Sequence, residues 1–146
     1  MSETIMDLLN QKNSEVYSVQ VDAILLDALR MMAEKRIGFV PVMDGEKIVG
    51  LYSERDFARL MAVREDIPLD TPIKEVMVSP VYFIKADQTI DEGMAVMGTM
   101  HFRHLPVLKD KKLIGVVSIG DIIKQEMFER NYTIEDLENI LWANLV

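Results

Sequence analysis

Two short segments place an aspartate three residues after a serine, and both could hold a phosphorylated sugar. They are Ser53 with Asp56 and Ser118 with Asp121. An ionised aspartate can accept hydrogen bonds from two ribose hydroxyls, and charge-assisted bonds of this kind are stronger than neutral ones. A serine hydroxyl and the free N–H groups at a helix N-terminus suit a phosphate. The same spacing also forms a capping box that only starts a helix, so ligand binding and capping are both open interpretations.

The two serine–aspartate pairs occupy equivalent positions in a tandem repeat. An offset of 65 residues aligns residues 22–61 with residues 87–126 without a gap, and 8 of these 40 pairs are identical. Further upstream the register slips by three residues, so residues 5–9 correspond to residues 73–77. The identical pairs include residues that set backbone geometry: Pro41/Pro106, Gly50/Gly115, Ser53/Ser118 and Asp56/Asp121. The predicted domains are repeat 1 at 1–66, repeat 2 at 67–130 and a C-terminal helix at 131–146.

Each repeat has the pattern of a β-α-β-β-α unit. Apolar residues at helical spacing predict helices that begin near residues 25 and 90, and two more at 54–63 and 119–129. A last helix begins at Thr133 and has no counterpart in repeat 1, so we expect it to pack elsewhere on the body or on another chain. Its apolar residues are Ile134, Leu137, Ile140, Leu141 and Leu145. The expected strands are 16–19, 39–43 and 47–53, and in the second repeat 81–84, 104–108 and 112–118.

Composition limits the classes of protein that this chain can be. Its 146 residues are 49% apolar and 27% charged, which predicts a globular chain with a real core. The net charge of −8 argues against a broad nucleic-acid surface, because phosphate neutralisation needs clustered cations. No apolar run approaches the roughly 18–20 residues that span a bilayer. We therefore expect a cytoplasmic protein with neither a nucleic acid nor a membrane as partner.

Two motifs resemble the CBS domain, which is named after cystathionine β-synthase. One is Val-Pro-Val at 40–42 followed by Ile-Val-Gly-Leu-Tyr-Ser-Glu-Arg-Asp at 48–56, and the other is its copy at 105–107 and 113–121. The resemblance covers about residues 1–129, and the ending is similar to that of small stand-alone bacterial CBS pairs. It implies an α+β fold, a tandem CBS-domain pair or Bateman module. In this fold two β-α-β-β-α repeats pack about a pseudo-two-fold axis, here with an added C-terminal helix.

The resemblance also implies a function. Clefts between the repeats of this family often bind adenosine-containing ligands, with AMP, ADP or ATP expected first and NAD or S-adenosylmethionine as further candidates. Two CBS pairs commonly associate into a flat dimer. The chain is therefore expected to be a non-catalytic sensor that acts through a homodimer or through an unidentified protein partner. The alternative is a ligand-independent dimerisation or docking module whose clefts are filled by side chains.

The family motif assigns expected roles to particular residues. Ser53, Asp56, Ser118 and Asp121 match the ribose-binding positions, and Arg55, Arg103 and His104 match positions that point toward phosphates. The repeats differ, because Gly38 and Phe39 replace Arg103 and His104, and Gly120 replaces Arg55. The two clefts are therefore expected to be unequal. An exposed basic pair at a strand edge is the alternative for Arg103 and His104.

The base of the ligand would lie against apolar and aromatic residues. The expected walls are Val16, Tyr17, Val81 and Tyr82, with backbone groups near Val42 and Val107 as hydrogen-bond partners. The alternative for both tyrosines is a place in the core.

Neither catalysis nor metal binding is expected. The chain has no cysteine nucleophile, no GxxxxGK[ST] phosphate loop, and no Ser/His/Asp constellation supported by its context. Asp56 and Asp121 lie in separate repeats, which is a poor arrangement for paired-carboxylate catalysis. His101 and His104 have a metal-like spacing, but no third ligand is apparent.

Overall fold

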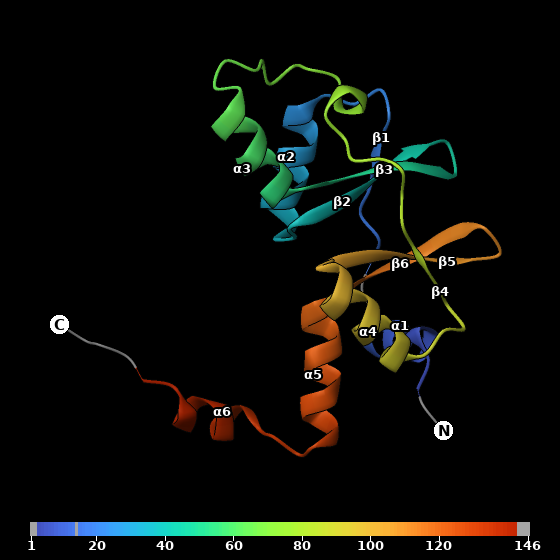
Figure 1. Cartoon of the computed structure of the whole chain (residues 1–146), viewed down its shortest axis with the longest axis vertical. Coiled ribbons are helices and arrows are strands. Elements are labelled where there is room, and N and C mark those ends of the chain that lie inside the picture. Colours follow the sequence, from blue (N-terminus) through green and yellow to red (C-terminus); the bar gives the residue numbers. More distant parts are fainter. Residues whose placement is uncertain (1–2, 14, 143–146) are drawn as a thin grey trace.

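The computed structural model describes residues 3–13 and 15–142, which form two similar three-stranded sheets (Figure 1). In each sheet a short strand pairs in parallel with the first strand of an antiparallel hairpin, giving the orders β1-β2-β3 and β4-β5-β6. The α+β duplication expected from the sequence is thereby confirmed. The strands are β1 (Val19–Gln20), β2 (Phe39–Asp44), β3 (Lys47–Ser53), β4 (Ile84–Lys85), β5 (His104–Lys109) and β6 (Lys112–Ser118).

Helices cover the two sheets and extend beyond the second one (Figure 1). None of the helices within the described ranges is both long enough and apolar enough to cross a membrane. The helices are α1 (Ile5–Lys12), α2 (Leu25–Lys35), α3 (Glu54–Val63), a short 3₁₀ helix η1 (Ile73–Glu75), α4 (Ile90–Met100), α5 (Ile119–Glu129) and α6 (Ile134–Ile140).

The strands that open each repeat are shorter and begin later than the sequence predicted. Pairing with the neighbouring hairpin strand begins only where Val19 lies opposite Val42 and where Ile84 lies opposite Val107. Residues 16–18 therefore lie outside the sheet. This leaves Tyr17 half-buried between the two repeats.

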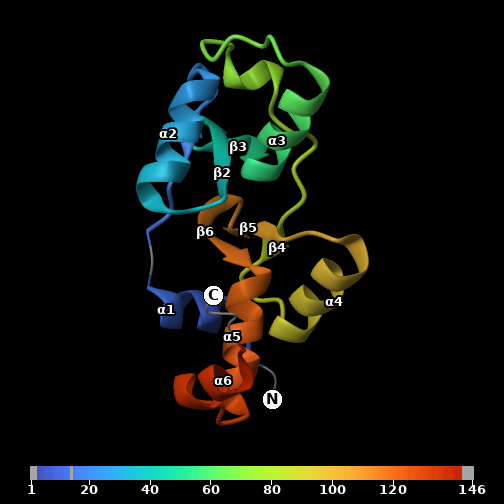
Figure 2. The same ribbon diagram turned by 90° about the vertical axis from the view of Figure 1, so that its left-hand side faces the viewer.

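The N-terminal segment of each repeat packs into the core of the other repeat. Ile5 and Leu8 of α1 are buried in the second core, and the Ile5 N–H donates to the Gln88 carbonyl at 2.8 Å. Ile73 of η1 is buried in the first core, and its N–H donates to the Ala23 carbonyl at 2.8 Å. Figure 2 shows α1 beside α5, below the second sheet, while α2 and α3 lie at the other end of the molecule.

Two equivalent glycines permit this exchange. A side chain on Gly115 of β6 would overlap Leu9 of α1, and a side chain on Gly50 of β3 would overlap Met77, just after η1. Leu9 and Met77 are separated by 68 residues, which is the repeat offset plus the three-residue slip seen in the sequence. The two exchanged segments are therefore structural equivalents, although only one of them forms a full α-helix.

Helix α6 begins where the sequence predicted. The Asp136 N–H donates to Thr133 Oγ1 at 3.1 Å, and the Thr133 N–H donates to Asp136 Oδ2 at 2.9 Å, which together form a capping box. No residue of α6 is buried among the residues that the structure describes, and the helix extends away from both sheets (Figure 1). Leu145, expected to extend its apolar side, lies outside the described residues.

Candidate functional site

Two clefts lie between the repeats, one beside each serine–aspartate pair. We call them the Asp56 cleft and the Asp121 cleft. The Asp56 cleft has a volume of about 470 Å³ and the Asp121 cleft one of about 610 Å³. Each is lined by residues from both repeats, and Gly38, Phe39 and His104 line both. A ligand in either cleft would therefore contact both halves of the molecule.

Both serine–aspartate pairs form capping boxes at the start of a helix. In the first, Ser53 Oγ accepts from the Asp56 N–H at 3.2 Å, and Asp56 Oδ2 accepts from the Ser53 N–H at 3.0 Å. Ser118 and Asp121 repeat the pattern at 3.0 Å and 2.9 Å. The capping role is thus present in both repeats. Oδ1 of each aspartate has no hydrogen bond to any described residue, so each could still accept a hydroxyl from a ligand.

The Asp56 cleft gathers cationic side chains around its aspartate. Arg55 and Arg59 come from consecutive turns of α3, and Arg103 comes from the end of the loop before β5. None of these three arginines forms an ion pair with another side chain in residues 3–13 and 15–142. Because guanidinium groups bind phosphate oxygens in a bidentate manner, this cleft has the charge that an anionic ligand needs.

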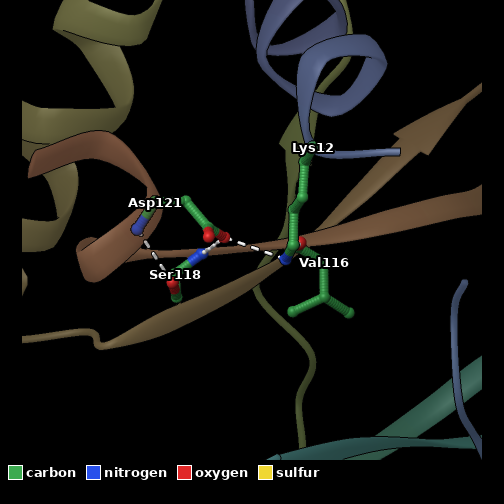
Figure 3. Close-up of polar contacts among 4 residues, drawn as sticks. All are labelled: Lys12, Val116, Ser118 and Asp121. Carbon is green, nitrogen blue, oxygen red and sulfur yellow. Dashed lines mark hydrogen bonds and ion pairs between the residues drawn. The ribbon is translucent and has the colours of Figure 1, made fainter. Parts of the chain in front are cut away.

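The Asp121 cleft is different, because a lysine of the chain already pairs with its aspartate. Lys12 Nζ, at the end of α1, donates to Asp121 Oδ2 at 2.9 Å and to the Val116 carbonyl at 3.0 Å (Figure 3). Lys35 and Arg36, at the end of α2, also line this cleft. The two clefts are thus unequal in charge arrangement, as the differences between the repeats suggested.

His104 lies where the two clefts meet. Its ring stacks on Phe39, with the ring centroids 4.9 Å apart and an angle of 9° between the planes. Burial lowers the pKa of His104, and nearby Lys12 and Arg103 lower it further, while Asp121 opposes the shift. The side chain is therefore mainly neutral at pH 7, and it offers hydrogen bonds rather than a full charge.

Each cleft also contains one of the two tyrosines. Tyr82 lines the Asp56 cleft, where it is 59% exposed and stacks on Phe102 at 5.7 Å between centroids. Tyr17 lines the Asp121 cleft, and Lys35 Nζ lies 4.9 Å from the centre of its ring. The exposure of Tyr82 excludes a place in the core. Its ring and Phe102 together give the Asp56 cleft an aromatic wall.

The remaining predicted site residues lie in different surroundings. Val16 lines the Asp121 cleft, whereas Val81 is half-buried and is not among the lining residues of either cleft. Val42 and Val107 are fully buried in the centre of their sheets. Their proposed hydrogen bonds to a base therefore stay a prediction.

Sequence reasoning missed three residues of the clefts. Arg59 follows Arg55 by four residues on a predicted helix, so helical spacing could have placed both on one face. Phe102 directly precedes the predicted Arg103, and only its stacking with Tyr82 reveals its place. Lys12 carried no local signal, because it reaches its partner only through the exchange of α1. Across residues 3–13 and 15–142, no group of three or more histidine, aspartate or glutamate side chains could hold a metal ion.

Comparison with known proteins identifies the family. The model of the CBS domain matches residues 5–63 and again residues 73–127, so the chain belongs to the CBS-domain family. The fold is a tandem CBS pair. The recognition made from the two sequence motifs is therefore confirmed.

Individual relatives agree with this assignment. A solved CBS-domain protein from Burkholderia ambifaria is 37% identical with a TM-score of 0.81, and the match covers 90% of this chain and 98% of that one. The mitochondrial CBS domain-containing protein CBSX3 of Arabidopsis thaliana is 28% identical over 145 residues, or 93% of this chain and 70% of its own. CBSX2, solved in complex with AMP, shares the fold at 21% identity with a TM-score of 0.73, covering 88% of this chain and 98% of its own.

Proposed function

We propose that this CBS pair is a non-catalytic regulatory module that binds AMP, ADP or ATP, with the Asp56 cleft as its main site. The observation that carries the proposal is the presence of Asp56 in one cleft with Arg55, Arg59 and Arg103. A nucleotide presents a ribose and an anionic phosphate at a fixed separation, and this cleft offers an acceptor and several cations between two repeats. The AMP complex of CBSX2 supports the choice of ligand.

The proposed binding mode follows from the surroundings of each group. Asp56 Oδ1 accepts a ribose hydroxyl while Oδ2 keeps its capping bonds to Ser53. The arginines hold the phosphate, because charge-assisted bidentate bonds are the strongest that the cleft can provide. The base lies against the aromatic wall of Tyr82 and Phe102, since stacking suits a flat ring.

Regulation would follow because the residues that line the Asp56 cleft come from both repeats. Arg55 belongs to the first repeat and Arg103 to the second, so a phosphate held by both favours one relative arrangement of the repeats. A ligand that binds one arrangement better shifts the population toward it. We propose that this shift is passed to a homodimer or to a protein partner.

A thermal-shift panel tests the proposal. AMP, ADP, ATP and, as a control for the base, GMP are added to the purified chain and to its Asp56→Asn and Asp121→Asn variants. A ligand at 100 times its Kd adds about 2.7 kcal/mol to the free energy of unfolding. Asn keeps an acceptor for the cap but loses the charge. We expect Asp56→Asn to weaken adenine-nucleotide binding by about 10- to 150-fold, which corresponds to roughly 1.5–3 kcal/mol for a charged hydrogen bond.

The matched aspartate variants make the result specific. Asp121→Asn is expected to leave most of the stabilisation by the nucleotide in place. Equal losses in both variants would contradict the assignment to the Asp56 cleft. The absence of a shift with every adenine nucleotide would favour the alternative, a dimerisation or docking module that acts without a ligand.

A further inference from the structure

We infer that Lys12 lowers the affinity of the Asp121 cleft for ribose-containing ligands, so that one side chain decides which of the two equivalent clefts binds them more tightly. The inference rests on the proposed function, because it concerns the same kind of ligand. It goes further by naming a specificity-determining residue that the repeat motif does not contain.

Lys12 neutralises the aspartate that a ligand would need, although it binds Oδ2 and leaves Oδ1 without a hydrogen bond to a described residue. Its Nζ donates to Asp121 Oδ2 at 2.9 Å and to the Val116 carbonyl at 3.0 Å, and Oδ2 also accepts from the Ser118 N–H (Figure 3). The side chains of Lys12 and Asp121 are 30% and 22% exposed, so both are partly shielded from water. A ribose hydroxyl that donates to Oδ1 therefore meets a weaker acceptor than Asp56, because the charge of this carboxylate is already shared with a cation.

The position of Lys12 is fixed by its helix. Thr4 and Asp7 form a capping box at the start of α1, and Ile5 and Leu8 anchor the helix in the core of the second repeat. Lys12 is the last residue of that helix. Because both ends of the contact belong to one packed unit, the lysine is held at the aspartate whichever way the repeats move against each other.

The Asp56 cleft has no such lysine. Gly115 contacts Leu9 and Gly50 contacts Met77, so the same offset of 68 residues makes Pro80 the counterpart of Lys12. Pro80 lines the Asp56 cleft but carries neither charge nor donor. Asp56 Oδ2 accepts instead from the hydroxyl of its own Ser53 at 2.8 Å. The two aspartates thus have matching caps, and only one of them is neutralised by a lysine.

The test uses adenosine, which has the ribose and the base but no phosphate. Removal of the lysine charge therefore takes away no attraction for the probe. ¹H–¹⁵N spectra are recorded during an adenosine titration of the unsubstituted chain and of Lys12→Met. The Ser53 and Ser118 amides report the two clefts separately, since each donates to the aspartate of its own cleft. Lys124→Met, an exposed lysine on α5, is the control for lost surface charge.

We expect Lys12→Met to lower the adenosine Kd reported by Ser118 about tenfold, which equals 1.4 kcal/mol, while the Kd reported by Ser53 stays unchanged. Lys12→Arg retains a cation and is expected to leave the Kd reported by Ser118 unchanged. The same is expected of Lys124→Met. An unchanged Kd at Ser118 in Lys12→Met overturns the inference, as does binding at Ser118 in the unsubstituted chain that equals binding at Ser53. A silent Ser53 amide in every protein overturns the Asp56 assignment instead, so the two failures are distinguishable.

Discussion

At the scale of single residues, His104 links the two clefts because its ring lines both and stacks on Phe39. Burial is the main cause that lowers its pKa below the usual value of 6.5. The unfolded chain therefore binds a proton near pH 6.5, and the folded chain binds it only at lower pH. The stability that this histidine contributes is complete above pH 6.5 and is lost as the pH falls toward the pKa of the folded state.

The expected result is a free energy of unfolding that decreases between pH 7.5 and 5.5. Urea denaturation at several pH values measures it, with His104→Phe, which preserves an aromatic ring against Phe39, and His101→Gln as variants. His104→Phe should remove most of this decrease. If His101→Gln removed it instead, the assignment to the buried ring would be wrong.

Tyr52 is a second residue whose effect on the free energy of unfolding can be predicted from its surroundings. It is 1% exposed, and its hydroxyl has no hydrogen-bond partner among the described residues. Burial, and secondarily the charge of Asp56, raise its pKa to about 12. The equivalent residue in the second repeat is Val117, which has no polar atom to bury. The hydroxyl is therefore a cost to folding that the second repeat avoids.

Tyr52→Phe should raise the free energy of unfolding by about 1 kcal/mol, because it removes a buried polar group that lacks a partner. The urea midpoint measures the change, and the slope of the transition should stay the same. A decrease in stability would mean that a water molecule satisfies the hydroxyl.

At the scale of secondary-structure elements, the exchange of α1 and η1 between the repeats makes each core depend on both. Ile5→Ala removes a fully buried side chain from the second core, and Ile73→Ala does the same in the first. Each substitution is expected to lower the free energy of unfolding by about 2–5 kcal/mol. Chemical denaturation followed by two probes, circular dichroism and tyrosine fluorescence, should give coincident transitions.

Val63→Ala is the matched control, because Val63 is 82% exposed on α3. It should change the stability by less than about 0.5 kcal/mol. Separate transitions for the two repeats in Ile5→Ala would contradict the interdependence of the cores.

Many of the elements could be predicted because they leave a local pattern, whereas α1 and η1 were not among the predicted helices, and β1 and β4 begin later than expected. Both hairpins, the helices after them and the start of α6 follow from turn residues, apolar spacing and capping boxes. The exchange could not be predicted, since an apolar helical face does not say which core covers it. The contact between Lys12 and Asp121 joins residues 109 positions apart and depends on that exchange. The clefts were therefore expected from the resemblance to the CBS family, but the ion pair between Lys12 and Asp121 in one of them was not.

At the scale of the whole molecule, large apolar side chains remain exposed on neighbouring helices. Helices α4 and α5 contact each other, and α6 follows α5 along the chain. Exposed apolar side chains on several helices are typical of interfaces between protein chains. The exposed residues are Met94, Val96 and Met100 on α4, Ile119, Ile123 and Phe128 on or at the start of α5, and Ile134, Leu137, Ile140, Leu141 and Trp142 on or after α6.

We expect this surface to form the proposed homodimer. Ile123→Asp combined with Met100→Asp should convert the dimer to a monomer, because each places a charge in an apolar contact. Light scattering coupled to size-exclusion chromatography measures the mass, for which the monomer is 16.7 kDa. Val63→Asp, at an apolar position of α3 that is 82% exposed, should leave the dimer intact. A mass of one chain for the unsubstituted protein would exclude this homodimer.

Because α1 and η1 are exchanged, a cut in the chain that connects the repeats separates each core from a segment that it needs. A cut between residues 64 and 70 would give one fragment that holds α1 but lacks Ile73, and another that holds η1 but lacks Ile5 and Leu8. Each fragment would have an incomplete core and would carry the missing piece of the other. Mixed together, the two fragments should assemble into the native arrangement, whereas each alone should stay largely unfolded. Native assembly of the mixed fragments would show that each core needs a segment from the other half of the chain, whether or not the two halves are covalently joined.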